Sequence, residues 1–185
     1  MIKEVLNEAD DKMSKSVEAT REEFATIRAG RANPSMFAKL TADYYGTPTP
    51  LQQLASFTSQ DARTIIVAPF DMGALAEIEK SIRDSDLGVN PSNDGRTIRC
   101  VFPELTEERR KEYIKLAKAK AEDGRVSVRN VRRTAKQSLE RLEKDGDVGQ
   151  DDVTGAEKKL DALTKKHTDA IDEMLKNKEA ELLEV

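Results

Sequence analysis

Apolar side chains recur every three or four residues over the first part of the chain. The series is Ile2, Val5, Leu6, Ala9, Met13, Val17, Thr20, Phe24 and Ile27. This spacing predicts an amphipathic helix of about seven turns over residues 2–27. Gly30 follows as the expected C-cap, and Pro34 prevents the helix from continuing.

The pattern changes between Arg31 and Pro103, a segment in which short apolar runs alternate with turn residues and which, with Pro103, holds all six prolines. Asp71 is expected to cap a short helix whose apolar face is Leu75, Ile78 and Ile82. We predict a small β/α/β module with strands over residues 40–45, 51–58, 64–68, 87–90 and 96–102. A turn at Asn93-Asp-Gly95 would join the last two strands.

Helical spacing resumes after Leu105, with Thr106 as the predicted N-cap of a second long helix. Its apolar stripe is Tyr113, Leu116, Ala117, Val128, Val131, Ala135, Leu139 and Leu142. Gly124 lies inside this helix and costs about 1 kcal/mol relative to alanine, so a bend there stays open. Residues 145–149 predict a turn. The last helix has a seam spaced as in coiled coils: Val153, Ala156, Leu160, Leu163, His167, Ala170 and Met174.

Three long helices with narrow apolar stripes predict an α+β fold, an elongated three-helix bundle with an inserted β/α/β domain. The bundle (domain I) would comprise residues 1–30 and 104–185, and the inserted domain II residues 31–103. Two linkers would join them, and Gly30, Arg31, Pro103 and Glu104 are the candidate hinge residues. The alternative is that residues 30–34 merely stop the first helix.

Composition fits a helix-rich protein with thin cores, since 37% of residues are hydrophobic and 36% are charged. The single cysteine excludes an internal disulfide and fits a reducing compartment. No apolar run approaches the roughly 20 residues of a membrane span, and Glu4 and Glu8 do not fit a signal peptide. We therefore expect a cytoplasmic protein without a membrane partner.

The net charge of −4 hides a strong polarity along the chain. Residues 109–144 contain 13 Lys/Arg and 5 Asp/Glu, whereas residues 145–185 contain 6 Lys/Arg and 12 Asp/Glu. Because binding responds to the local field, the acidic overall balance does not argue against a nucleic-acid partner.

Basic residues concentrate on one part of the second long helix. Arg125, Arg129, Arg132 and Lys136 recur at helical steps, and Arg133 adjoins them; we call these five residues the arginine surface. Guanidinium groups match phosphate geometry, which favours a polyanion as the partner. The alternative is a solvated surface balanced by acids of the neighbouring helix. Residues 125–136 contain no acid, so we expect no internal pairing of these bases along their own helix.

The chain offers little material for catalysis. His167 is the only histidine and lies on the predicted seam, where a packed side chain is expected. Cys100 alternates with Ile98 and Phe102, which predicts a structural thiol in a small core. Phosphate-binding glycine loops and Cys/His metal spacings are absent from the sequence. We expect no enzyme activity, no small-molecule substrate, no metal and no cofactor of its own.

Four separated motifs resemble the bacterial ribosome recycling factor family over essentially the whole chain. They are TIRAGRANP (Thr26–Pro34), DLGVNP with NDG (Asp86–Pro91, Asn93–Gly95), LTEERR (Leu105–Arg110) and VSVRNVRR (Val126–Arg133). One departure is Pro103-Glu104-Leu105, where the family often has Pro-Pro-Leu.

The resemblance implies an L-shaped monomer that acts on the post-termination ribosome. With elongation factor G and GTP, family members split the ribosome into subunits and release mRNA and deacylated tRNA. The elongation factor binds the GTP. The family's bundle contacts large-subunit ribosomal RNA, and Arg129 and Arg132 occupy its RNA-contact positions. The resemblance also implies RNA contacts for Arg31, in the first motif, and Arg110, in the third.

A rival interpretation from a different class is a helical adaptor whose bundle binds partner helices. It predicts self-association or protein partners, with weak salt dependence, whereas the ribosome interpretation predicts a monomer whose RNA binding falls steeply as salt rises.

Overall fold

The computed structural model describes residues 1–28 and 30–184, so Ala29 of the first motif and Val185 lie outside the described residues. The described residues form two compact units. Unit 1 contains Met1–Phe24 and Lys115–Glu179; unit 2 contains Ala25–Ile114 and the chain's end from Ala180. The start of the second long helix and the end of the third thus group with the β-rich part. The domain boundaries at residues 30 and 103 stay a prediction.

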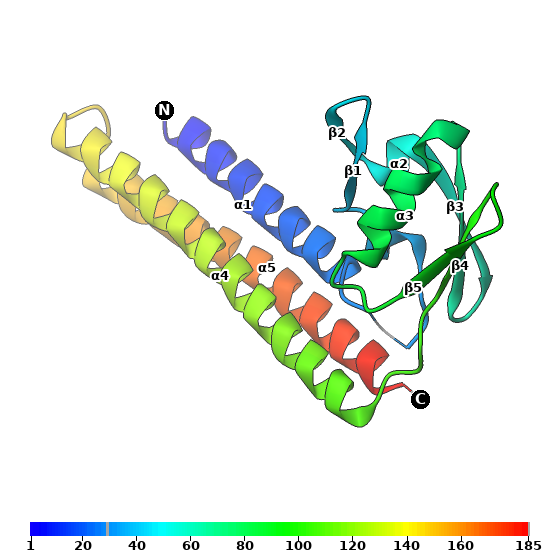
Figure 1. Cartoon of the computed structure of the whole chain (residues 1–185). Coiled ribbons are helices and arrows are strands. Elements are labelled where there is room, and N and C mark those ends of the chain that lie inside the picture. The colour runs from blue at the N-terminus through cyan, green and yellow to red at the C-terminus, as the bar shows by residue number, and fades with distance from the viewer. Residues whose placement is uncertain (29, 185) are drawn as a thin grey trace. The chain divides into compact units, whose positions relative to one another are not determined.

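Unit 1 is built from most of three long helices, α1 (Ile2–Ala25), α4 (Glu107–Lys144) and α5 (Gln150–Leu183), which run side by side there (Figure 1). Each helix buries part of the stripe expected from its spacing, for example Met13 of α1, Leu139 of α4 and Leu160 of α5, while other members such as Val5 and Leu163 are only half-buried. Leu116 was expected in the stripe of α4 but is 41% exposed, because the smaller Ala117 faces the core instead. In α5 the buried seam passes through Ile171, whereas the predicted Ala170 is only half-buried.

Gly124 lies where α4 packs closely against both other long helices. A Cβ atom there would overlap Thr20 Oγ1 of α1 and lie 3.1 Å from Ile171 Cδ1 of α5. Together with Ala117 and Ala121 it gives α4 a stripe of small buried residues. The glycine is therefore a packing requirement, and α4 continues through it as one helix.

Helix α1 ends at Ala25, earlier than the predicted Ile27, and Gly30 is not its C-cap. The next residues make other contacts within unit 2. Ile27 is buried, while Arg28 donates a hydrogen bond to the carbonyl of Pro103 and lies 5.5 Å from the centre of the Phe102 ring. Burial lowers the pKa of this guanidinium group from its ordinary value.

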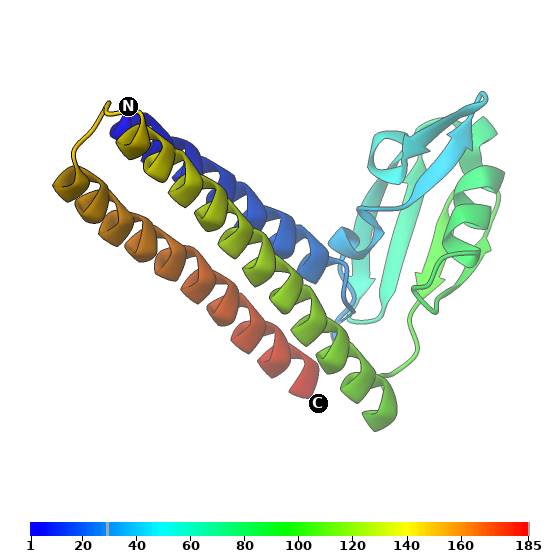
Figure 2. The same ribbon diagram turned by 90° about the vertical axis from the view of Figure 1, so that its left-hand side faces the viewer.

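Unit 2 contains a two-stranded hairpin, β1 (Thr41–Tyr44) and β2 (Thr47–Pro50), and a four-stranded antiparallel sheet (Figure 2). The sheet has the order β3-β4-β6-β5, with β3 Ala55–Asp61, β4 Thr64–Pro69, β5 Asn90–Asn93 and β6 Ile98–Val101. Helix α3 (Leu75–Arg83) packs on β1 and β5. Short turns complete the unit: η1 Pro34–Phe37, α2 Leu51–Leu54 and η2 Met72–Ala74.

Several local predictions for unit 2 are confirmed. Asp71 caps η2 by accepting a hydrogen bond from Gly73 N at 2.9 Å, and the chain continues directly into α3. Ile78, Ile82 and Cys100 are fully buried in the core beside the sheet. The turn before β6 is held by Asp94, whose Oδ1 accepts from Thr97 N at 2.8 Å.

Other strand predictions were wrong. Residues 51–54 form a helical turn, because Leu51 and Leu54 are both buried and a strand would point them to opposite faces. The strand predicted at 87–90 lies at 90–93 and includes Pro91, which an edge strand tolerates. Strand β2 was not predicted because it contains Pro48 and Pro50; it pairs with β1 alone.

Candidate nucleic-acid interface

The arginine surface lies on α4 in unit 1, as its spacing predicts. The helix turns its buried stripe, which includes Val128 and Ala135, toward the other two helices. Arg125, Arg129 and Arg132 flank that stripe. Arg125 and Arg132 bind carboxylates of α5, and Arg129 binds Glu122 of its own helix. The structure thus brings the three arginines onto one border of the bundle.

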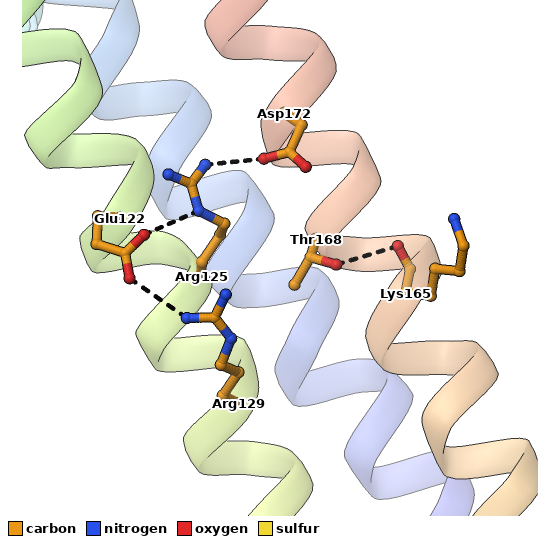
Figure 3. A network of polar contacts seen from close by, with 6 residues as sticks. All are labelled: Glu122, Arg125, Arg129, Lys165, Thr168 and Asp172. Atoms are coloured by element: carbon orange, nitrogen blue, oxygen red, sulfur yellow. Dashed lines mark hydrogen bonds and ion pairs between the residues drawn. The ribbon is translucent and has the colours of Figure 1, made fainter.

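Arg125 is the most enclosed member of the arginine surface. Its Nε donates to Glu122 Oε2 at 3.0 Å, and its Nη1 donates to Asp172 Oδ1 of α5 at 2.8 Å (Figure 3). Its side chain is only 19% exposed. Two of its three nitrogen atoms are therefore engaged within the bundle, and Arg125 joins α4 to α5.

Arg129 and Arg132 each bind one carboxylate instead of two, and both side chains are more exposed than that of Arg125. Arg129 Nη1 lies 3.3 Å from Glu122 Oε1, and its side chain is 55% exposed. Arg132 Nε donates to Asp161 Oδ1 of α5 at 2.8 Å. Within the described residues, both terminal nitrogens of Arg132 form no further hydrogen bond. This side chain keeps a two-pronged donor edge for an external oxygen anion.

The remaining two bases have no carboxylate partner within the described part of the chain. Arg133 Nη2 donates to Asn130 Oδ1 at 2.7 Å on the same helix. Lys136 is half-buried and forms no ion pair there.

The pairing corrects one inference from the sequence. The absence of acids within residues 125–136 suggested that the arginines have no partner on their own helix. Glu122 lies one turn before that stretch and accepts from both Arg125 and Arg129. These hydrogen bonds, with the one from Arg125 foremost, lower the pKa of Glu122 below its ordinary value.

Arg31 and Arg110 belong to unit 2, not to the unit that carries the arginine surface. With Gly30, Arg63 and Glu104 they line a hollow of about 760 Å³ within unit 2. Arg110 Nε is buried and finds no hydrogen-bond partner among the described residues.

The four candidate hinge residues also lie in unit 2, and Pro103 contributes the carbonyl that accepts a hydrogen bond from Arg28. Arg28 was not singled out from the sequence, and its place in TIRAGRANP was the available signal.

The side chains considered for catalysis are packed. His167 is 6% exposed, and its Nε2 lies 2.7 Å from Asp10 Oδ1 of α1. Cys100 is fully buried, and burial raises the pKa of its thiol to about 12. Across residues 1–28 and 30–184, no group of side chains could hold a metal ion and no helix is apolar and long enough to span a membrane.

Comparison with known proteins points to one family. A sequence model described as "Ribosome recycling factor" matches residues 20–183. The ribosome-recycling factor of Nocardioides sp. is 77% identical over 185 residues and that of Kineococcus radiotolerans is 62% identical, each covering 100% of both chains.

Solved structures agree with the sequence relatives. A solution structure of the ribosome recycling factor superposes with a TM-score of 0.78 at 36% identity, covering 100% of this chain and 98% of the other. A second matching structure is described as models for the T. thermophilus ribosome recycling factor and the E. coli elongation factor G bound to the E. coli post-termination complex. It gives a TM-score of 0.69 at 41% identity with full coverage of both chains.

Proposed function

Because the chain belongs to the ribosome recycling factor family, we propose that it acts with elongation factor G and GTP to split the post-termination ribosome into subunits. Splitting would release mRNA and deacylated tRNA for a new round of translation. The protein would act as a monomer in the cytoplasm, and the elongation factor would bind the nucleotide. This role would not require this chain to carry out a covalent reaction.

The observation that carries the proposed binding mode is the arrangement of Arg129 and Arg132. Both lie on one border of a rigid helix, and each keeps donors that are unused within the described residues. Ribosomal RNA of the large subunit supplies phosphate oxygens that match such donors. Contacts of this kind fix the position of a protein on RNA more than they read sequence.

The three other residues of the arginine surface would strengthen the electrostatic attraction to RNA. Arg133 and Lys136 have no carboxylate partner within the described residues, whereas Arg125 is held by two. We therefore assign Arg133 and Lys136 to phosphate contacts and give Arg125 mainly a positioning role. Arg31 and Arg110 remain candidates for separate RNA contacts from unit 2.

The mechanical step would depend on the linkers around Gly30, Arg31, Pro103 and Glu104. We propose that they allow the inserted domain to move relative to the bundle while elongation factor G acts on the protein. The free energy for splitting would come from the partner's nucleotide cycle. The bundle, with its continuous 38-residue helix α4, would transmit force as a stiff element.

Sedimentation of post-termination ribosomes tests this function. Ribosomes are incubated with this protein, elongation factor G and GTP, and each component is omitted in turn. We expect free subunits only in the complete mixture. Subunits that appear equally without this protein, or intact ribosomes in the complete mixture, would refute the proposed function.

A further inference from the structure

Three carboxylates are interleaved with the arginine surface: Glu122 on α4, and Asp161 and Asp172 on α5. We infer that these carboxylates make the arginine surface selective, because they lower its affinity for polyanions that do not fit the donors left open. This inference rests on the proposed function, in which the fitting polyanion is large-subunit RNA.

Each carboxylate occupies a particular part of a guanidinium group. A guanidinium group offers two edges to a phosphate: the terminal edge, Nη1 with Nη2, and the side edge, Nε with Nη2. Asp161 occupies Nε of Arg132 and leaves the terminal edge open. Glu122 occupies Nη1 of Arg129 and leaves the side edge open. In Arg125 both edges are partly used, so one nitrogen atom remains.

The open edges of Arg129 and Arg132 are therefore different ones, the side edge in Arg129 and the terminal edge in Arg132. A rigid RNA surface with phosphates at both positions can make bidentate contacts with Arg129 and Arg132 without breaking an ion pair. A flexible single strand lacks that fixed geometry, so it must displace a carboxylate or accept fewer contacts.

The same carboxylates weaken general attraction. Non-specific binding of nucleic acid depends on the number of phosphates that the protein neutralises. Three of the five bases are paired with these three acids, so the net charge available to a loosely bound strand falls from +5 to +2. Repulsion between carboxylate and phosphate adds to this effect for any strand that approaches out of register.

The pairs are weak enough to be altered without unfolding the bundle. The side chains of Glu122, Asp161 and Asp172 are 53%, 59% and 57% exposed. Exposed ion pairs contribute little to stability. The amide variants Glu122→Gln, Asp161→Asn and Asp172→Asn keep the shape and one oxygen acceptor while they remove the charge.

The test compares the triple amide variant with the parent protein on two ligands, poly(U) and isolated large ribosomal subunits, across a salt series. We expect poly(U) affinity to rise about tenfold, with a log–log salt slope steeper by about 2, because about three more cations become available. Affinity for large subunits should change by less than about threefold, so the specificity ratio falls.

A matched control removes three acids from α1: Glu8→Gln, Asp11→Asn and Glu18→Gln. Each of these acids is paired along α1, with Lys12, Lys15 and Arg21 respectively, so the control has the same net charge as the triple variant. The control should leave poly(U) affinity within about twofold of the parent.

Three results would overturn the inference: an equal rise in poly(U) affinity for the control, an equal rise for both ligands, or no rise at all. Circular dichroism checks that the variants are folded, and the single variant Asp161→Asn repeats the comparison with a smaller change. If the parent protein does not bind large subunits, that result refutes the proposed function. The poly(U) comparison then still tests whether the three carboxylates lower the affinity for a single strand.

Discussion

At the scale of single residues, Arg132 combines two properties that usually exclude each other. Its Nε is fixed by Asp161, while its terminal nitrogens stay available within the described part of the chain. A fixed side chain loses less conformational entropy on binding than a free one. The residue is therefore the most informative position at which to test the interface.

Arg132→Glu should weaken binding to large ribosomal subunits by roughly tenfold or more, because a phosphate contact becomes a repulsion. The affinity is measured by sedimentation with isolated subunits. Helix content and melting temperature should stay close to the parent values, because the lost ion pair with Asp161 is partly exposed and such pairs contribute little to stability. Arg21→Glu on α1, a 59% exposed position, serves as the matched charge reversal. Equal affinities for the Arg132 variant and the parent would refute the assignment.

Cys100 provides a second test at this scale. Its thiol is fully buried with a pKa raised to about 12, so the reactive thiolate is scarce at pH 8 and shielded from reagents. We expect slow labelling by a maleimide in the native protein and labelling at least about a hundredfold faster in urea. Mass spectrometry follows the reaction over time. Rapid native labelling between pH 7 and 9 would show that the core beside β6 opens readily.

The sequence predicts the bases of the interface but not their partners. Helical spacing is a local property, so it is enough to place Arg125, Arg129 and Arg132 on one face. Asp161 and Asp172 are 29 and 47 residues away from the arginines that they bind. Those pairings depend on how α5 packs against α4, which the spacing within one helix does not determine.

At the scale of elements, prediction succeeds where many residues share one period. The long helices extend over several turns, and their stripes average out single exceptions such as Leu116. Strands of four residues give no such averaging. The conformation of two short segments depends on their tertiary surroundings. Residues 51–54 form a helical turn, and residues 90–93 form a strand that accepts Pro91 because it lies at the sheet edge.

Gly124→Ala should destabilise unit 1 although alanine favours helix. The gain in helix propensity is about 1 kcal/mol, whereas forcing a methyl group against Thr20 and Ile171 costs about 1–3 kcal/mol. We expect a net loss of about 1 kcal/mol in the free energy of unfolding, measured by urea titration. Adding Thr20→Ala should recover part of the loss, because Oγ1 is the atom that the methyl group meets.

Gly155→Ala is the control for this prediction. Gly155 lies in α5 with open space around a Cβ atom, so alanine should stabilise by up to about 1 kcal/mol. If both alanine variants stabilise the protein equally, close approach at Gly124 is not the reason for that glycine.

At the scale of the whole molecule, the proposed hinge can be tested by restraining it. Arg31→Cys and Glu104→Cys place thiols on two residues that line the same hollow, in a Cys100→Ala background. A short bifunctional cross-link between them should slow ribosome splitting several-fold while it changes large-subunit binding much less. The same protein without the cross-link is the control. Splitting at an unchanged rate after cross-linking would contradict the hinge.

Salt dependence separates the RNA-binding protein from a helical adaptor at this scale. Binding to large subunits through about four phosphates should give a log–log slope of roughly −3 to −4. Sedimentation equilibrium should find a monomer. A flat salt response, or self-association at working concentration, would favour protein–protein recognition by the bundle.

The hydrogen bond from Arg28 to the main-chain oxygen of Pro103 affects which substitutions the linker can accept. The acceptor is a main-chain oxygen, which every amino acid supplies. Replacements at positions 103 and 104 can therefore leave this hydrogen bond intact, and the side chain of Glu104 does not enter it. The arginine has no such freedom, because no other side chain offers the same reach together with a flat cation above Phe102.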